Sequence, residues 1–108
     1  MAEAYKKEIV QRMTKSLLDI QLLRLIQIQP LWGYRIKKKA EEKLHTKLRH
    51  GALYPKLNSL EKKGFLISKK QQQGRRVRKV YTITEKGKEY LEAYFATLKD
   101  QIDGKDLK

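Results

Sequence analysis

The clearest chemistry in the sequence lies in a run of basic residues around Gly74. Six lysines and arginines occur within eleven residues that contain no acid: Lys69, Lys70, Arg75, Arg76, Arg78 and Lys79. Such a run can be a solvated face, and lysines also protect edge strands from aggregation. Arginines repeated beside a glycine turn exceed that need and suit a phosphate backbone or a minor groove. We therefore predict nucleic-acid contacts, and the contact residues would be Arg75, Arg76, Arg78 and Lys79.

The overall charge agrees with a polyanionic partner. The chain has 108 residues, with 26 Lys+Arg against 12 Asp+Glu and a net charge of +14. This exceeds what solubility requires and causes self-repulsion in the folded state. The length fits a single domain, and the hydrophobic fraction of 40% is typical of a folded protein. Because the sequence has neither an apolar leader nor an apolar stretch of membrane-spanning length, we expect a cytoplasmic protein.

Enzyme signatures are missing from the sequence. Cysteine is absent, which excludes disulfides, thiolate metal sites and cysteine nucleophiles. The glycines do not form a nucleotide-binding loop, and no Gly-x-Ser-x-Gly motif occurs. His45 and His50 would lie about 140° apart around a helix, so they could not share a metal ion. We expect a protein that is not an enzyme and has no cofactor or metal.

Hydrophobic periodicity predicts mostly helices with one pair of strands. The expected helices cover 1–17, 17–28, 34–44, 46–63 and a last segment from 85, and the expected strands cover 65–70 and 77–84. Ser16 is expected to cap the second helix and Thr84 the last one. The order predicts an α+β, mostly α fold. It comprises a winged helix-turn-helix at 17–84, an extra N-terminal helix at 1–16, and a C-terminal helix and tail at 85–108.

The expected helix over 46–63 has the character of a helix that enters a major groove. Its leucines face inward, and its outward face would present Gly51, Pro55, Asn58, Ser59 and Lys62, with Tyr54 on the flank. Gly51 would allow close approach, Asn58 would read adenine, and Lys62 and Tyr54 would reach phosphates. An ordinary solvated face is the alternative. Pro55 requires a position near the helix start, so we expect a short or kinked first turn.

A second basic cluster precedes this helix. Seven lysines and arginines lie between Arg35 and Arg49, against two acidic residues. Part of this cluster should flank the groove, and we include Tyr34, Arg49 and His50 among the DNA-contacting residues. For Tyr34, a half-buried position in the core is an equal alternative.

Three stretches between Leu17 and Leu91 resemble the PadR family of transcriptional regulators. Residues 31–36, Leu-Trp-Gly-Tyr-Arg-Ile, are similar to the opening of the family's second winged-helix helix. Gly51-Ala-Leu-Tyr-Pro55, followed by Leu57-x-x-Leu60-Glu61-x-x-Gly64, is similar to its recognition-helix signature. Gly74-Arg-Arg-x-Arg78-Lys-x-Tyr81-x-Ile83-Thr84-x-x-Gly87 is similar to its wing and return strand. Ala52, where threonine is commoner, and an extra Val77 are departures that leave the fold assignment unchanged.

The resemblance implies a homodimer that binds double-stranded DNA. Two apolar faces are surplus to a winged-helix core: Tyr5, Ile9 and Met13 near the N-terminus, and Leu91, Tyr94, Phe95, Leu98 and Ile102 near the C-terminus. Exposed apolar faces usually mark interfaces, and PadR proteins pair their terminal helices across a dimer. Folding of both helices back onto their own domain is the alternative. The resemblance also implies that a small aromatic or drug-like effector can bind between the dimer halves, as in some family members. Here Trp32 is expected to be a core plug, and whether a ligand is sensed stays open.

We therefore predict a sequence-specific DNA-binding transcriptional regulator that acts as a homodimer on a palindromic operator. Repression by occlusion of a promoter is the expected mode. One alternative is a ribosomal or other RNA-binding winged-helix protein, because small and strongly basic chains are common in that class. The other is an architectural DNA-binding protein without sequence preference, which the excess charge suggests. The ratio of affinity for a chosen palindrome to that for random DNA separates these classes.

Overall fold

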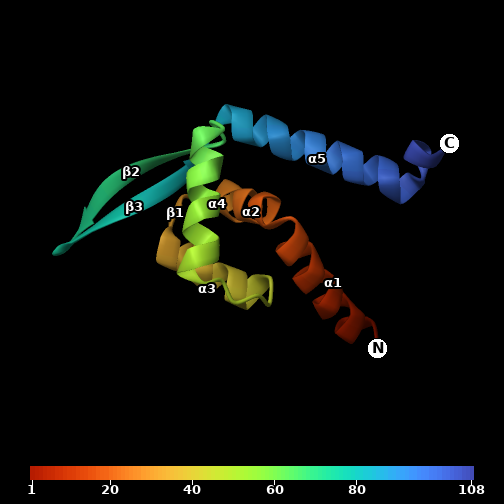
Figure 1. Ribbon diagram of the computed structural model, residues 1–108, viewed down its shortest axis with the longest axis horizontal. Helices are drawn as coiled ribbons and strands as arrows, with labels where there is room; N and C mark the ends of the chain where they lie inside the picture. Colours follow the sequence, from red (N-terminus) through yellow and green to blue (C-terminus); the bar gives the residue numbers. More distant parts are fainter.

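The computed structural model describes all of residues 1–108 and consists of helices around a small antiparallel sheet (Figure 1). Its elements in chain order are α1 (Ala2–Ser16), α2 (Leu18–Ile28), β1 (Leu31–Trp32), α3 (Gly33–Lys43), α4 (His50–Lys62), β2 (Leu66–Gln73), β3 (Arg76–Ile83), α5 (Glu85–Asp103) and the short 3₁₀ helix η1 (Lys105–Leu107). The helices α2, α3 and α4 with the β2–β3 wing form the winged helix-turn-helix. The predicted mostly helical α+β fold, with an extra helix at each end, is confirmed.

The sheet has three strands in the order β1-β3-β2, and both pairings are antiparallel. The wing pairs eight residues of β2 with eight of β3. Only Gly74 and Arg75 form its turn, where Gly74 has a φ of 61°, a conformation that glycine adopts without strain. The expected strands, which stop at 70 and resume at 77, are therefore too short, because the glutamines at 71–73 and Arg76 continue the ladder.

The strand β1 is a feature that the sequence does not predict. The expected helices leave residues 29–33 without regular structure, but Leu31 and Trp32 pair there with Tyr81 and Val80 of β3. Two residues are too few to show an alternating pattern, so this strand is defined by its partner rather than by its own sequence. The pairing attaches the wing to the start of α3.

The boundary between α1 and α2 lies at Leu17, and Ser16 does not cap α2. The Leu17 amide still donates to the Met13 carbonyl at 2.8 Å, so Ser16 belongs to α1. The Asp19 carboxylate instead accepts a hydrogen bond from the Ile20 amide at 2.9 Å. The predicted cap is wrong because a capping residue must leave the helical conformation, which Ser16 does not.

The helix α4 begins at His50, four residues later than the sequence predicts. His45 has a φ of 52° and turns the chain out of α3. The Thr46 hydroxyl donates to the Leu44 carbonyl at 3.0 Å, and Leu48 is buried before α4 begins. This local turn and the burial of Leu48 override the helical propensity of the segment.

The core lies where α2 crosses the other elements. Sixteen buried hydrophobic residues form one cluster, and its completely buried members include Leu22, Leu23, Ile36 and Leu57. Burying one such side chain contributes about 1.5–3 kcal/mol of hydrophobic free energy. Because α2 contacts α3, α4, α5 and β3, it holds α4 and the base of the wing in one body.

The end of the wing is fastened to α5 through Thr84. As predicted, Thr84 caps α5: its hydroxyl accepts from the Gly87 amide at 3.1 Å and donates to the Gly64 carbonyl at 2.6 Å. Gly64 follows the end of α4 with a φ of 82°, a left-handed conformation in which glycine commonly terminates a helix. A Cβ on Gly87 would collide with the Phe65 carbonyl oxygen. The end of α4 and the start of α5 therefore form one tight junction.

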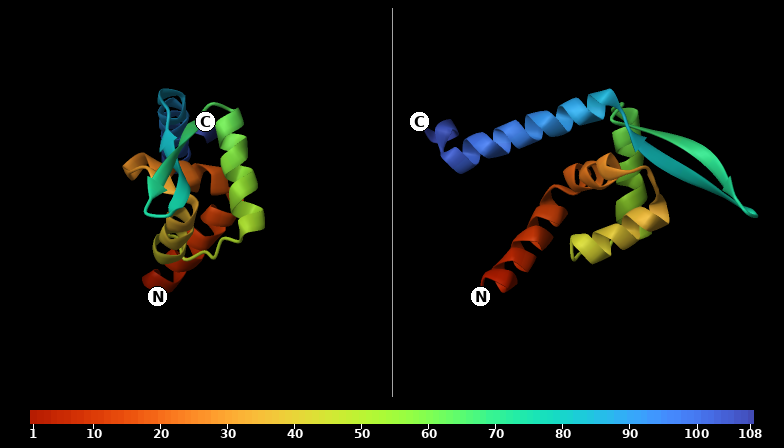
Figure 2. Two further views of the ribbon diagram at one scale, coloured as in Figure 1. Left: turned by 90° about the vertical axis from the view of Figure 1, so that its left-hand side faces the viewer. Right: turned by 180° about the vertical axis from the view of Figure 1, so that it is seen from behind.

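The terminal helices extend away from the winged-helix body (Figures 1 and 2). In Figure 1 and in the right-hand view of Figure 2, α1 and α5 diverge, and both chain ends lie far from the wing. The chain is accordingly elongated, with extents of 55 × 33 × 22 Å. No helix of the structure is both long and apolar enough to cross a membrane.

Candidate nucleic-acid interface

The outward face of α4 has the composition that the sequence predicts. Gly51, Pro55, Asn58 and Lys62 are exposed, whereas the leucines of the helix point into the core. A Cβ added at Gly51 would meet no atom within 4 Å, so the space in front of it is open to a partner's backbone. Ser59, also expected on this face, is half-buried. Exposure is confirmed for the four other residues, and their contacts with DNA stay a prediction.

Pro55 is the sixth residue of α4 and lies in its second turn. Proline has no amide hydrogen, so the Gly51 carbonyl loses its usual helical partner. The first turn is tightened, since the Arg49 carbonyl accepts from both the Ala52 amide at 3.0 Å and the Leu53 amide at 2.9 Å. The predicted short or kinked first turn is therefore seen only as this tightening, since the helix continues past Pro55 to Lys62.

Tyr54 connects α4 to the start of α3. Its hydroxyl and ring occupy the space where a Cβ at Gly33 would lie, so glycine is required at that position. His50 stacks on Tyr54 with ring centroids 5.3 Å apart and planes at 5°. Arg49 and His50 are exposed at the N-terminal end of α4. Tyr54 thus anchors α4 against α3, whereas the side chains of Arg49 and His50 face solvent.

The tip of the wing carries free positive charge. Arg75 and Arg76 are exposed, and neither forms an ion pair. Lys69 and Lys70 of β2 are exposed as well. Guanidinium groups held in solvent on a two-stranded ribbon are available to a phosphate backbone.

The base of the wing, by contrast, has its basic side chains engaged within the protein. The Arg78 guanidinium lies 4.9 Å from the centroid of the Trp32 ring, in a cation–π contact. The Lys79 ammonium lies 3.1 Å from a carboxylate oxygen of Glu61. This hydrogen bond to Glu61 raises the pKa of Lys79, although desolvation opposes the shift. Burial raises the pKa of the Tyr81 phenol beside it.

A hollow of about 320 Å³ separates α4 from the wing. Its walls are formed by Trp32, Tyr34, Tyr54, Asn58, Val77, Arg78, Lys79 and Tyr81. Asn58 of α4 and the strand β3 therefore border one concave surface. Tyr34 is 54% exposed, which decides against its alternative place in the core. Trp32 is half-buried, with its indole N–H buried and unpaired, so the expected core plug describes it only in part.

The terminal helices present most of the apolar residues that the sequence predicts there. Tyr5, Ile9, Phe95 and Ile102 are exposed, and the partly buried members are Met13, Tyr94 and Leu98. Because the outer halves of both helices stay exposed, the alternative of complete folding back onto the domain is wrong. Leu91 is also wrong as a dimerisation residue, since it is completely buried in the core of its own chain.

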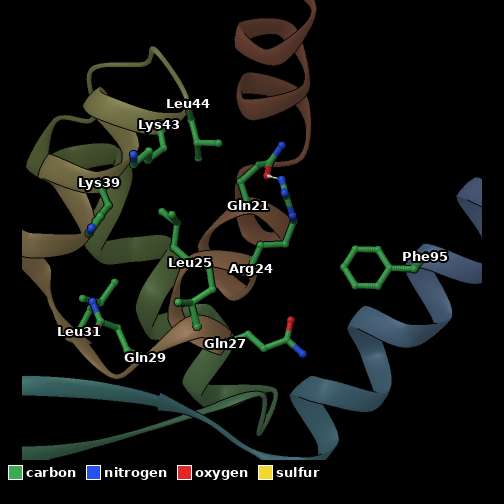
Figure 3. A pocket seen from close by; sticks show the side chains of 11 residues that line it. Gln21, Arg24, Leu25, Gln27, Gln29, Leu31, Lys39, Lys43, Leu44 and Phe95 are labelled. Carbon is green, nitrogen blue, oxygen red and sulfur yellow. Dashed lines mark hydrogen bonds between the residues drawn. The ribbon is translucent and has the colours of Figure 1, made fainter.

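A second hollow, of about 500 Å³, lies between α2, α3 and α5 (Figure 3). It is lined by the apolar residues Leu25, Ile28, Leu31, Leu44 and Phe95 and by the polar residues Gln21, Arg24, Gln27, Gln29, Lys39 and Lys43. Figure 3 shows Phe95 on α5 facing α2 across the opening. The lining contains three cations and no acid, so it suits an apolar group with a negative charge.

Three residues that hold the wing against the rest of the protein are not identified from the sequence. Trp32 covers Arg78, and Glu61 and Ser68 connect α4 to the wing. A signal for Glu61 was present, because it is the only acidic residue of α4. Nothing local marks Ser68, whose role depends on the fold.

Comparisons with known proteins agree with this architecture. The Transcriptional regulator PadR-like family matches residues 22–93. A comparison with curated proteins finds no match.

Several solved structures share the fold. A PadR-like transcription factor from Bacteroides fragilis has a TM-score of 0.78 at 24% identity, over 92% of this chain and 96% of its own. A PadR family transcriptional regulator from Eggerthella lenta has a TM-score of 0.76 at 24% identity, over 95% and 90% of the two chains. PadR of Bacillus subtilis in complex with operator DNA has a TM-score of 0.68 at 30% identity, over 73% of this chain and 46% of its own.

The family match runs from α2 to α5 and so includes α4, the wing and the hollow between them. With its winged-helix fold, this chain belongs to the PadR-like family of transcriptional regulators.

Proposed function

We propose that this regulator binds double-stranded DNA sequence-specifically, as a homodimer on a palindromic operator, and represses transcription by occluding a promoter. One observation carries the DNA-binding part: Asn58 of α4 and the strand β3 of the wing border the same hollow. A helix with an exposed hydrogen-bonding face therefore lies beside a ribbon with free arginines at its tip. The net charge of +14 and the DNA complex of the Bacillus subtilis relative support this proposal.

In the proposed complex, α4 lies in the major groove and Asn58 contacts a base edge. The open space before Gly51 admits the DNA backbone at the start of the helix. The wing tip, with Arg75 and Arg76, lies over the phosphates or in the adjacent minor groove. Lys62, Tyr34, Arg49 and His50 are placed as flanking phosphate contacts.

The homodimer pairs the terminal helices of two copies. The exposed residues Tyr5 and Ile9 of α1 and Phe95 and Ile102 of α5 supply the apolar surface for this pairing. Two winged-helix bodies would then address half-sites one helical turn apart, about 34 Å. The complex would act in the cytoplasm.

The affinity ratio between selected and random DNA tests the core of this proposal. Duplexes selected from a random pool would be titrated against a scrambled duplex and against an RNA duplex of the same sequence at one salt concentration. A specific regulator should prefer the selected DNA by about 10³-fold or more. A ratio near one would indicate an architectural protein, and preference for the RNA would indicate an RNA-binding protein.

A small aromatic effector is a second proposal, which the hollow between α2, α3 and α5 supports. Its apolar walls and its three cations suit an aromatic anion. The probe is 1-anilinonaphthalene-8-sulfonate, whose fluorescence rises in an apolar site. Ile28→Asn should weaken this binding, whereas Ile67→Asn on the wing, which also removes an exposed isoleucine, should not. Equal binding by both variants would contradict the proposal.

A further inference from the structure

One carboxylate on α4 holds both strands of the wing. Glu61 Oε2 accepts a hydrogen bond from the Ser68 hydroxyl of β2 at 2.8 Å. Glu61 Oε1 lies 3.1 Å from the Lys79 ammonium of β3. Since Ser68 and Lys79 belong to different strands, a single side chain connects α4 to the whole width of the hairpin.

This contact is partly shielded from water. The Glu61 side chain is 25% exposed and the Lys79 side chain is 48% exposed. The other ion pair of the chain, Lys88 with Glu85, is more open at the acid, which is 85% exposed. A partly shielded carboxylate that contacts two partners holds them in a more defined geometry than a solvent-exposed ion pair does.

Attraction to DNA does not explain Glu61. It is the only acid of α4, and a carboxylate beside the proposed interface repels phosphates. Its contribution must therefore come from what it does to its neighbours.

The position of the contact gives it leverage over the wing tip. From Ser68 the hairpin continues for about five residues, roughly 17 Å of strand. A tilt of about 10° at the base would displace the tip by about 3 Å, on the same strand length. This exceeds the tolerance of a hydrogen bond to a phosphate oxygen.

A second contact holds the strand β3 from its other face. Consecutive side chains of a strand point to opposite faces, so Arg78 and Lys79 diverge. Arg78 lies over Trp32 of β1, while Lys79 reaches Glu61 of α4. The base of the wing is therefore held between β1 and α4.

We propose that Glu61, together with Ser68 and Lys79, forms a brace that fixes the wing against α4, and that Glu61 is a positioning residue for sequence discrimination. Lys79 accordingly acts through Glu61 rather than on a phosphate. The inference rests on the proposed DNA-binding function for its effect on discrimination, and on the free protein alone for its effect on the wing.

The first test compares Glu61→Gln with Glu85→Gln. Both variants remove one negative charge and one ion pair, but only the first lies between α4 and the wing. Glu61→Gln should lower the ratio of affinity for the selected duplex over a scrambled one by about three- to tenfold, within the range for coupled residues. Glu85→Gln should leave this ratio unchanged. An equal ratio in both variants would overturn the role in discrimination.

The second test separates positioning from direct contact at Lys79. If Lys79 contacts a phosphate, Lys79→Gln should lower the slope of log affinity against log salt by about 0.9 per protomer. The brace instead predicts an unchanged slope and a lower affinity ratio. It also predicts that Glu61→Gln combined with Lys79→Gln loses no more of the ratio than Glu61→Gln alone, because Glu61 is the partner of both Ser68 and Lys79. A lower slope or additive losses would overturn it.

The third test needs no DNA. Hydrogen exchange on the free protein reports opening of the β2–β3 ladder. Glu61→Gln should speed exchange of the wing amides by about three- to tenfold, on the same coupling range, while Glu85→Gln should not. Unchanged wing exchange would overturn the brace itself. A wild-type protein without preference for the selected duplex would overturn the proposed function instead, and the exchange rates would still decide the brace.

Discussion

Arg75 and Arg76 at the tip of the wing are exposed and unpaired, whereas Arg78 and Lys79 at its base lie against Trp32 and Glu61. Both pairs carry two positive charges, and only Val77 separates them in the sequence. Their positions on the hairpin determine what their charges meet, because the tip reaches beyond the body and the base lies against β1 and α4. Within this basic run, Arg75 and Arg76 therefore face outward, whereas Arg78 and Lys79 contact the rest of the protein and hold the wing in place.

The largest expected effect concerns the dimer, because two tips act in one complex only if two copies are joined. Phe95→Asp with Ile102→Asp places charges on an exposed face of α5. Sedimentation should show folded monomers, and affinity for the selected duplex should fall by about 10²- to 10⁴-fold through lost avidity.

The matched control for this variant is Ala93→Asp with Thr97→Asp. These exposed positions lie on the opposite face of α5, roughly 160–200° around the helix from Phe95. They add the same charge and should leave the dimer intact. A stable dimer in the Phe95 and Ile102 variant would place the interface elsewhere.

The next effect isolates the wing tip. Arg75→Ala with Arg76→Ala removes up to about four phosphate contacts from a dimer, so the slope of log affinity against log salt should decrease by about 3–4. The melting temperature should barely change, since exposed charges contribute little to stability. Binding isotherms at several salt concentrations measure the slope. Lys105→Ala with Lys108→Ala removes the same charge at the C-terminus and should leave it unchanged; a common response would mean that the tip has no special role.

Asn58 tests base discrimination, whereas the arginines of the wing tip test electrostatic attraction to phosphates. Asn58→Ala should cost about 1–3 kcal/mol at one base position per half-site and leave other positions unaffected. Lys62→Ala, on the same exposed face, should weaken binding to all sequences equally. Titration of single-base variants of the selected duplex gives the pattern. A uniform loss on Asn58→Ala would reassign that residue to the backbone.

Much of this arrangement can be predicted from the sequence. The inward leucines of α4, the Thr84 cap and the exposed arginines beside Gly74 follow from local rules of periodicity, capping and turn chemistry. These features depend on neighbours in the chain, so the sequence contains their cause.

The features that the sequence does not predict depend on distant partners. The strand β1 exists because β3 offers a free edge to Leu31 and Trp32. Leu91 has the spacing of an exposed stripe but is buried because α5 begins against the core. The contacts of Arg78 with Trp32 and of Lys79 with Glu61 likewise require β1 and α4 to lie on either side of β3. No local sequence pattern encodes that arrangement.

A smaller effect distinguishes tip from base without DNA. Arg78→Ala removes the cation–π contact with Trp32 and should lower the free energy of unfolding by about 0.5–1 kcal/mol. Because the chain has a single tryptophan, its emission should also shift. Arg76→Ala, two residues away at the exposed tip, should change neither quantity. Chemical denaturation followed by fluorescence measures both, and equal behaviour of the two variants would remove the distinction.

The smallest expected effect is the pH dependence of the stability that Lys79 and Tyr81 contribute at the base of the wing. The bond to Glu61 raises the pKa of Lys79 above 10.5, and burial raises the pKa of Tyr81 above 10.0. The folded state therefore holds protons that the unfolded chain releases. Stability should be complete below about pH 10 and fall as pH rises through the folded-state pKa values.

Lys79→Gln should reduce this alkaline loss of stability in denaturant unfolding measured at pH 9 and pH 11. Lys88→Gln removes a lysine from the open ion pair and controls for the general discharge of lysines. If both variants lose stability alike between the two pH values, the ammonium at the base is held no more firmly than one on the open surface.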